Sequence, residues 1–335
     1  MGQSIQLMSS NPELITIKKD YSGNKIRDGR YLNYQKVNAP RFKDIWNWRL
    51  SRNRSKLKQT NSSFILDVIE NQNIFDRTKP KIVWLGHASF LITLNNKNIL
   101  LDPVFFNIPL FKRLAKIPFS INNYNSIDYI LISHAHFDHL DKTTIKALSI
   151  LNPQLKIYCG LGTSQLINNK WKLQNTVVEA GWYQQYPVEN DSLEFYFMPA
   201  LHWSKRTLYD RNKKLWGSFV IKGNSSNIYF MGDSGYSSHF KEIGNLFDDL
   251  DYVILGIGAY NPQNIMQTSH LNPEEAKQAY IDLGAKYLVP MHYGTYDLTD
   301  EPRFEPLSRI KKAFESEQDN LKIIKIGEML KIMNC

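Results

Sequence analysis

The feature that most constrains this chain is a cluster of metal-binding residue types directly after an apolar stretch. Residues 128–133 are rich in β-branched and aromatic side chains, which predicts a short buried strand. The next six residues include His134, His136, Asp138 and His139. Imidazole and carboxylate groups are ligands that zinc and its first-row neighbours accept. We therefore expect a metal site on a loop at the carboxyl end of a strand, with a polar surface loop as the alternative.

The spacing of these four residues resembles the signature of the metallo-β-lactamase-fold hydrolases. This resemblance implies that further ligands follow later strands, and the sequence offers one after each of three strand-like stretches. The candidates are His202 after residues 193–199, Asp233 after residues 228–232, and His292 after residues 287–291. Each alone would be an ordinary polar loop residue, but together and in this order they match the family.

By resemblance to the binuclear members of the family, the chain is expected to hold two Zn²⁺ ions, or two other divalent transition metals. One metal would take His134, His136 and His202, the other Asp138, His139 and His292, and Asp233 would bridge them. An extended backbone points His134 and His136 to one side, whereas the next two ligands need a turn to reach a second ion. Two cations about 3.5–4 Å apart activate a shared water and neutralise charge at phosphorus. We therefore expect a hydrolase.

Composition narrows the class of protein. With 335 residues, of which 42% are hydrophobic and 13% aromatic, the chain can bury a large core. It has no apolar run of membrane-spanning length, no secretory apolar core at its N-terminus, and no Ser or Thr at position 6 for myristoylation. Cys159 and Cys335 are placed neither for a structural disulfide nor for metal binding. We expect a cytoplasmic protein, peripheral to a membrane if it binds one.

The net charge is concentrated near the N-terminus. Residues 1–80 contain 15 Lys or Arg and 7 Asp or Glu, which accounts for +8 of the net charge of +9. Cations beside aromatic residues suit an anionic membrane surface, and also a polyanion such as RNA. An extension that wraps the core is the third interpretation. The residues concerned are Lys18, Lys19, Lys25, Arg27, Arg30, Lys36, Arg41, Lys43, Arg49, Arg52, Arg54, Lys56 and Lys58, interleaved with Tyr31, Tyr34, Phe42, Trp46 and Trp48.

Residues 81–335 alternate strand-like and helix-like patterns, so we predict a hydrolase domain there and a basic aromatic extension over residues 1–80. Strand runs with interspersed helices fit two sheets packed face to face with helices outside. This is the α/β fold, an αββα sandwich, that the family resemblance implies. We expect strands at 81–85, 90–94, 98–101, 128–133, 156–159, 193–198, 215–221, 228–231, 252–255, 287–291 and 321–326. We expect helices at 143–151, at 273–283 with Asn272 as N-cap and Pro273 in first position, and at 307–317.

Within the superfamily, several stretches resemble the N-acylphosphatidylethanolamine-hydrolysing phospholipase D group. They are residues 83–90, 100–105, 199–204, 232–236, 270–276 and 291–295, with 28–33 and 46–48 upstream. After Asn33 that group usually has Pro-Trp, whereas this chain has Tyr34 and Gln35. The resemblance implies a phosphodiesterase that releases N-acylethanolamine and phosphatidic acid from a phospholipid at an anionic membrane surface.

Two other classes of function stay open. Sugar-phosphate lactonases share the phrases at 86–90 and 101–103, so a hydrolase of a soluble anion, such as a lactone or a cyclic phosphodiester, is the main alternative. A nucleic-acid processing enzyme or binding protein is less favoured, since Phe137 stands where tRNA-maturation nucleases usually carry Gly. A homodimer is compatible with either enzyme.

Other polar residues are candidates for supporting roles. His270, just before the cap of the 273–283 helix, is our candidate for the general acid or an oxyanion contact, unless it only flanks the helix. Asp138 is counted as catalytic as well as a ligand. We expect His87 to orient a ligand carboxylate, with a core histidine as the alternative, and Asp102 to hydrogen-bond a ligand histidine. His239 carries no pattern and is expected at the surface.

Overall fold

The computed structural model describes residues 7–37, 40–51, 64–188 and 192–332. Its strands are β1 (Leu7–Ser9), β2 (Asn24–Arg27), β3 (Arg30–Tyr31), β4 (Lys81–Gly86), β5 (Ser89–Leu94), β6 (Lys97–Leu101), β7 (Tyr129–Ile132), β8 (Lys156–Gly160), β9 (Thr176–Ala180), β10 (Gln184–Gln185), β11 (Glu194–Met198), β12 (Ser218–Lys222), β13 (Asn227–Phe230), β14 (Tyr252–Gly256), β15 (Tyr287–Met291) and β16 (Met329–Lys331). Its helices are α1 (Phe42–Ser51), α3 (Lys142–Leu151), α4 (His239–Leu246), α5 (Gln263–Met266), α6 (Pro273–Leu283) and α7 (Glu305–Ala313), with the short helical turns η1 (Gln72–Phe75), η2 (Ile121–Asn123), η3 (Gln165–Lys170) and η4 (Gln318–Asn320).

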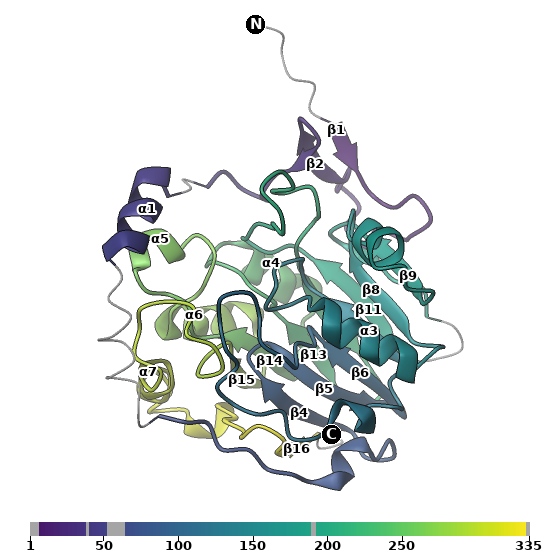
Figure 1. Cartoon of the computed structure of the whole chain (residues 1–335), viewed down its shortest axis with the longest axis vertical. Coiled ribbons are helices and arrows are strands. Elements are labelled where there is room, and N and C mark those ends of the chain that lie inside the picture. Colours follow the sequence, from purple (N-terminus) through teal and green to yellow (C-terminus); the bar gives the residue numbers. More distant parts are fainter. Residues whose placement is uncertain (1–6, 38–39, 52–63, 189–191, 333–335) are drawn as a thin grey trace, which may run out of the picture.

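Two mixed sheets form the body of the molecule (Figure 1). The first has seven strands in the order β16-β4-β5-β6-β7-β8-β9, antiparallel up to β6 and parallel from β6 onward. The second has six strands in the order β10-β11-β12-β13-β14-β15, of which the last three are parallel. Parallel strands need a crossover of a dozen or more residues, and α3 and α6 supply two of these crossovers.

The main hydrophobic core joins the two sheets. It contains aromatic side chains from both of them, including Trp84, Phe90, Phe197 and Phe219, all essentially inaccessible to solvent. A second core lies on the other face of the seven-stranded sheet, and it contains Ile145 and Leu148 of α3 together with Ile130 and Ile132 of β7. A strand buried on both faces reads as a continuous apolar run, and that is why residues 129–132 were recognisable as a strand.

Helix α6 begins and ends as its sequence predicts. The Asn272 side chain accepts a hydrogen bond from the backbone amide of Glu275, and the Glu275 carboxylate accepts one from the backbone amide of Asn272, which completes a capping box. Pro273 occupies the first turn, and Gly284 follows the helix with a left-handed backbone at φ 65°. These local signals fix the position of His270, which lies two residues before the cap.

The N-terminal part of the chain does not stand apart from the body. Strands β1–β3 form a small third sheet, and Ile17 donates its amide hydrogen to the carbonyl of Tyr183 beside β10. Lys18 and Tyr34 both contact the Glu242 carboxylate of α4. Tyr31 is only 8% exposed. For residues 7–37 the interpretation as an extension packed on the core is therefore the one that the contacts favour, while Arg52, Arg54, Lys56 and Lys58 lie outside the described residues.

The structure corrects several expected elements. The final strand was predicted at 321–326, but Leu321 and Ile326 form only isolated bridges, to Leu288 and Val68, and the last strand is β16. The strand predicted from residue 215 begins at Ser218 instead, because the amides of Leu215 and Gly217 bond to Leu161 and Ser133 outside the ladder. Strands β9 and β10 and helix α4 were not predicted. No described helix has both the length and the apolar character needed to cross a membrane.

Candidate metal centre

The seven predicted ligands converge at one edge of the two sheets. Each lies just beyond the carboxyl end of a strand: His134, His136, Asp138 and His139 after β7, His202 after β11, Asp233 after β13 and His292 after β15. Neighbouring parallel strands end at the same edge of a sheet, and the two sheets bring their edges together. All seven side chains are buried except those of His136 and Asp138, which are partly exposed. The site therefore opens to solvent beside these two residues.

The first predicted triad is present as a group. The His136 Nδ1 atom lies 2.9 Å from His134 Nε2 and 3.2 Å from His202 Nε2. One ring nitrogen from each of the three histidines falls within 4.8 Å of the others, which is close enough to surround one cation. The two-residue spacing in the sequence thus places His134 and His136 on the same side, as expected from an extended backbone.

The second predicted triad is also present, with one further histidine. Asp138 Oδ2 lies 3.6 Å from His139 Nε2 and 3.7 Å from His292 Nε2. His87 joins this group, since its Nε2 atom lies 3.0 Å from the same carboxylate oxygen. The geometry therefore matches the predicted contact of His87 with a ligand carboxylate, and it also allows His87 itself to offer a ligand atom.

Asp233 lies between the two triads. Its Oδ2 atom is 3.8 Å from Nε2 of both His134 and His202, and 3.0 Å from His139 Nε2. Its Oδ1 atom is 3.2 Å from His292 Nε2. One carboxylate thus faces both groups, which is the position that a bridging ligand needs.

Several buried polar atoms at this point form no hydrogen bond within the described chain. They are His136 Nε2, His139 Nε2, Asp233 Oδ1 and both ring nitrogens of His292. Buried polar atoms in native proteins are almost always paired, and each exception calls for an explanation such as an ion. Nitrogen and carboxylate oxygen atoms are also the donor set that zinc and related divalent metals prefer. The residues present therefore fit a divalent transition-metal site.

The candidate ligand histidines are oriented by hydrogen bonds from residues on the side of the ring away from the other candidate ligands. His139 Nδ1 lies 2.7 Å from Asp102 Oδ2, so the predicted contact between Asp102 and a ligand histidine is present. Asp102 also accepts the amide of Ser133, at 2.7 Å, which ties it to the end of β7. His202 Nδ1 lies 3.0 Å from the carbonyl oxygen of Ser269. Such contacts fix the tautomer and the ring orientation of a ligand histidine.

Burial and charge set the protonation states of the site. Burial lowers the pKa of His134 and His202, and it lowers the pKa of His136 to about 4, so these imidazoles are neutral at pH 7. Burial would also lower the pKa of His292, but the nearby carboxylates of Asp233 and Asp138 outweigh it and raise this pKa to about 9. These carboxylates favour positive charge here, and a bound cation would supply the same charge.

His270 lies beside the site. Its Nδ1 atom is 3.8 Å from Asp233 Oδ2, and its ring lies 5.4 Å from those of His202 and His292. Burial lowers the pKa of His270 to about 4. His239, in contrast, was expected at the surface and is only 1% exposed, because it begins α4 and hydrogen-bonds Ser237 at 2.6 Å and Ser234 at 3.2 Å.

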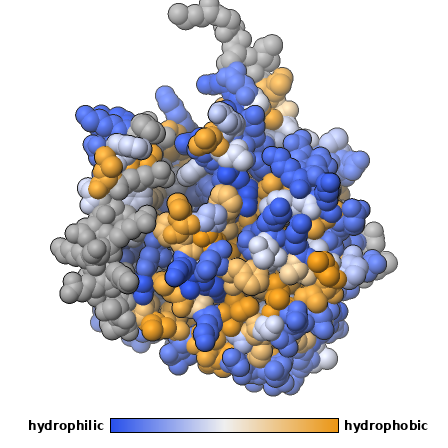
Figure 2. Space-filling model, viewed as in Figure 1, coloured by the Kyte–Doolittle hydropathy of each residue, from blue (hydrophilic) through white to orange (hydrophobic). Residues whose placement is uncertain are grey.

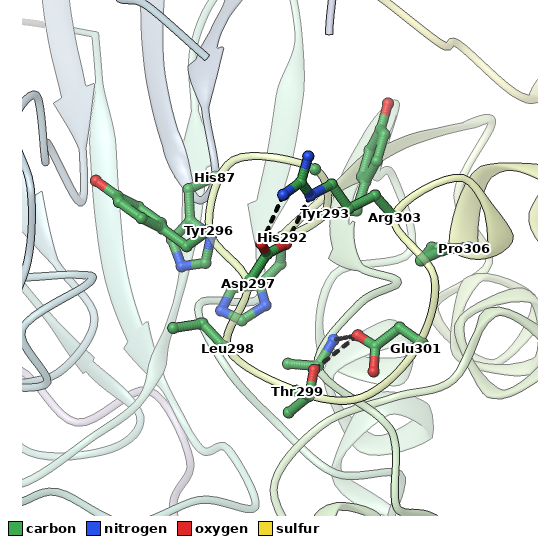
Figure 3. Close-up of a pocket in the computed structure, with 12 residues that line it drawn as sticks. His87, His292, Tyr293, Tyr296, Asp297, Leu298, Thr299, Glu301, Arg303 and Pro306 are labelled. Carbon is green, nitrogen blue, oxygen red and sulfur yellow. Dashed lines mark hydrogen bonds and ion pairs between the residues drawn. The ribbon is translucent and has the colours of Figure 1, made fainter. Parts of the chain in front are cut away.

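Sequence reasoning missed the residues that hold the loop after β15. This loop borders a small cavity of about 20 Å³. Figure 3 shows the residues that line it, among them His87 and His292. Arg303 makes two 2.6 Å bonds to Asp297, and Glu301 accepts the amide of Ala259 at 2.6 Å. Charged residues without metal-binding spacing gave no signal in the sequence, since their partners are defined only by the folded loop.

Arg206 is a second element that the sequence did not reveal. Its Nη1 atom lies 3.1 Å from the carbonyl oxygen of Ala135 and 2.5 Å from that of Leu140. Its guanidinium lies over the ring of Phe137 at 4.1 Å. Because Arg206 follows His202 in the chain, this contact joins the loop that carries His202 to the loop after β7.

Comparisons with known proteins agree with this geometry. Residues 97–293 match the beta-lactamase superfamily domain. The chain is 31% identical over 249 residues to an N-acyl-phosphatidylethanolamine-hydrolyzing phospholipase D of Caenorhabditis elegans, covering 70% of each protein. It is 32% identical over 224 residues to a metal-dependent hydrolase of Caldivirga maquilingensis, covering 64% of this chain and 82% of the relative. The structure of a metallo hydrolase from Ignicoccus hospitalis superposes with a TM-score of 0.59 at 20% identity, covering 76% of this chain and 99% of the other.

Proposed function

Because this chain belongs to the beta-lactamase superfamily, with the α/β metallo-β-lactamase fold, we propose that it is a binuclear-zinc phosphodiesterase of the phospholipase D type. The substrate would be N-acylphosphatidylethanolamine, and the products N-acylethanolamine and phosphatidic acid. The relative in Caenorhabditis elegans supports this substrate. The observation that carries the proposal is the pair of ligand groups on either side of Asp233.

Each metal would be held by one of these groups. His134, His136 and His202 would hold one ion, Asp138, His139 and His292 the other, and Asp233 would serve both. Two such ions supply Lewis acidity, which lowers the pKa of a water and neutralises charge on phosphate oxygens.

Residues of the chain would complete the reaction. Hydrolysis joins a water oxygen to phosphorus, breaks the bond from phosphorus to the ethanolamine oxygen, and leaves that oxygen to take up a proton. His270 has a pKa of about 4 because it is buried, so its imidazole is neutral at pH 7. A neutral imidazole donates one N–H bond but does not carry the second proton of an imidazolium. Of its two predicted roles, the contact with a developing oxyanion is therefore favoured over that of general acid.

A hydrolase of a soluble anion is the second candidate. Two observations favour it. Residues 16–34 of the basic extension pack on the body, where Lys18 and Tyr34 contact Glu242. The cavity beside His87 has a volume of about 20 Å³, which is room for roughly one water molecule. Against it stands an open, mainly apolar groove of about 740 Å³ bounded by Phe106, Ile117 and Phe119, which is large enough for part of an acyl chain.

Metal content and substrate can be tested together. The purified chain is analysed for zinc and assayed on N-acylphosphatidylethanolamine in mixed micelles, with a soluble bis-aryl phosphodiester as the second substrate. We expect about two zinc ions per chain and turnover of the lipid. Two zinc ions with cleavage of the aryl ester alone would move the substrate to a soluble anion, and a metal-free, inactive protein would refute the proposal.

A further inference from the structure

The chain between β6 and β7 presents an unusual surface close to the metal centre. Residues 103–120, here called the 103–120 loop, contain Lys112, Arg113 and Lys116 and no Asp or Glu. They also contain ten apolar side chains of the Val, Ile, Leu, Phe, Ala type, several of them exposed. Exposed apolar side chains that lie together on a protein surface often mark an interaction site. We therefore ask what this loop contacts.

The loop is fixed to the body. Arg113 donates to the carbonyl oxygens of Val104, at 2.7 Å, and Ala115, at 2.8 Å, and also to that of Leu85. Leu114 donates its amide hydrogen to Thr295 at 2.9 Å. Hydrogen bonds from the Arg113 guanidinium and from the backbone therefore hold the exposed apolar side chains of the loop in place.

The tip of the loop turns apolar side chains outward. Ile108 and Phe111 exchange backbone hydrogen bonds of 3.1 and 3.0 Å, which closes a tight turn. At this turn Leu110 has φ 72°, a left-handed backbone that leucine adopts rarely, and its side chain is 88% exposed. Phe106 and Leu114 are each 38% exposed. Apolar side chains gather on the face shown in Figure 2, with hydrophilic ones around them.

Charge decides which partner suits this surface. Lys112 and Lys116 are exposed beside the apolar side chains. Lys116 and Phe106 also line the open groove of about 740 Å³, where Glu70 is the single carboxylate among the lining residues. Apolar groups flanked by lysines match a layer with acyl chains inside and negative phosphates at its surface.

The loop also lies near the reaction centre. Tyr296 donates its hydroxyl hydrogen to the carbonyl oxygen of Phe106 at 2.7 Å, and its ring packs edge-on against His87, with centroids 5.0 Å apart. His87 in turn contacts Asp138. A lipid held at the loop would therefore be close to the candidate ligands.

We propose that the 103–120 loop docks the protein on an anionic phospholipid surface. Phe106, Leu110 and Leu114 enter the acyl region, while Lys112 and Lys116 contact lipid phosphates. The inference deepens the proposed function, because it rests on a lipid as the substrate, and it places the contact at this loop in addition to the N-terminal extension.

Vesicle binding tests the loop without any turnover. Leu110→Asn keeps a residue that tolerates a left-handed backbone, and it is combined with Leu114→Gln. Lys112→Gln with Lys116→Gln removes the charges. The matched control is Ile150→Gln, because Ile150 is 77% exposed in the last turn of α3, outside the loop. Binding is measured by sedimentation with vesicles of phosphatidylcholine, with and without phosphatidylglycerol, at low and high salt.

We expect the double leucine variant to bind about a hundredfold more weakly to anionic vesicles, roughly tenfold for each side chain. The double lysine variant should lose about fivefold for each charge, on anionic vesicles and at low salt only. The Ile150→Gln control should bind as the unaltered chain does. Turnover of the bis-aryl phosphodiester should persist in all variants, which shows that they are folded.

Unchanged vesicle binding in the leucine and lysine variants would overturn the inference. A second outcome would also overturn it: the unaltered chain is a dimer, and the leucine variants are monomers that still bind vesicles. The loop would then be covered by a second copy of the chain and not by lipid. Neither vesicle lipid is the proposed substrate, so these outcomes are distinct from failure of the lipid assay described above.

Discussion

At the residue scale, the site consists of imidazoles and carboxylates that hydrogen bonds already orient; His134, His136 and His202 are neutral at pH 7, whereas the carboxylates raise the pKa of His292 to about 9. His139 lies between Asp102, whose Oδ2 atom is 2.7 Å from Nδ1, and Asp233, whose Oδ2 atom is 3.0 Å from Nε2 without hydrogen-bond geometry. His87, Asp102 and His292 all have positive φ angles, of 56°, 38° and 65°. Non-glycine residues adopt such conformations where the surrounding structure enforces them, often at functional sites. The surrounding fold thus holds these three residues in place.

Turnover is expected to be lost when a central candidate ligand is replaced. His136→Ala and Asp233→Asn should each lower turnover by more than about a thousandfold, because the two ions together supply several kcal/mol of charge stabilisation. Both variants should stay folded, since the hydrophobic cores do not include either residue. Metal content, circular dichroism and hydrolysis of both substrates are the measurements. Normal turnover in either variant would refute the binuclear assignment.

The carboxylate behind His139 is expected to tune metal binding. Asp102→Asn keeps the side-chain shape and can still accept the Ser133 amide, but its NH₂ group opposes the N–H of His139. We expect zinc affinity to fall about 10–100-fold, measured by competition with a chromophoric chelator. Asp128→Asn is the matched control, because Asp128 precedes the same strand at its opposite end. Equal zinc affinities in the two variants would show that Asp102 does not support metal binding.

At the element scale, the ends of strands position the candidate ligands, and a few side chains hold the connecting loops together. Gly232 has φ 62°, and a Cβ atom there would lie 2.5 Å from Ser133 Cβ, so only glycine fits between β13 and the loop after β7. Asp233 follows at once. The close approach of these two strand ends thus explains why one carboxylate can face both ligand groups.

Arg206 is expected to act as a positioning residue between two of these loops. Arg206→Met would leave the carbonyl oxygens of Ala135 and Leu140 without their donor, so we expect a loss of about 2–3 kcal/mol in unfolding free energy. Metal affinity should fall with it, because His134 and His136 belong to the same loop. Arg206→Lys should recover part of both. The control is Lys213→Met, an exposed residue of the same connection. The unfolding free energy is measured by chemical denaturation and the zinc affinity by titration. If Arg206→Met equals the Lys213→Met control in both quantities, Arg206 has no positioning role.

At the scale of the whole molecule, the N-terminal segment is part of the site. Asn33 accepts the amide of His202 at 3.2 Å, and Tyr34 beside it contacts Glu242 on α4. The segment therefore contacts both the loop that carries His202 and helix α4, with Tyr34 and Gln35 where the resemblance to the phospholipase group led us to expect Pro-Trp. Deleting residues 1–60 would remove this contact as well as any membrane contact, so point substitutions test membrane binding more cleanly.

Glu242 is expected to hold this segment in a pH-dependent way. Burial would raise its pKa, but bonds from Lys18, Tyr34 and Tyr183 outweigh it, and the pKa lies below the usual 4.5. A group with a lowered folded-state pKa stabilises the fold above its unfolded pKa, and this contribution is lost as the pH falls through the folded value. Between about pH 5 and 3, the unaltered chain should therefore lose more stability than Glu242→Gln.

At pH 7 the Glu242→Gln variant should unfold about 1–3 kcal/mol more easily, since three donors lose a charged acceptor. Urea unfolding at several pH values measures both effects, and proteolysis within residues 16–34 should become faster. A variant whose stability falls with acid as steeply as that of the unaltered chain would show that another group dominates.

The sequence by itself determined the local features of this protein. The 134–139 cluster, the candidate ligands after three later strands, and helix α6 with its capping box were all recognisable, because each depends on neighbours within a few residues. The metallo-β-lactamase fold followed from the same motifs by resemblance. Strand β7 was recognisable because burial on both faces gives a continuous apolar run.

Tertiary structure decided the features that depend on partners distant in the chain. Four such features leave no periodic signal in the sequence. They are the burial of His239, the contacts of Arg206 between two loops, the loop held by Arg303 and Glu301, and the packing of residues 16–34. Strand β16 was placed wrongly because its pairing with β4, some 250 residues away, overrides the apolar pattern of 321–326. Local spacing encodes which residues can bind a metal, whereas only the packed fold brings their supports, and the surface around them, into place.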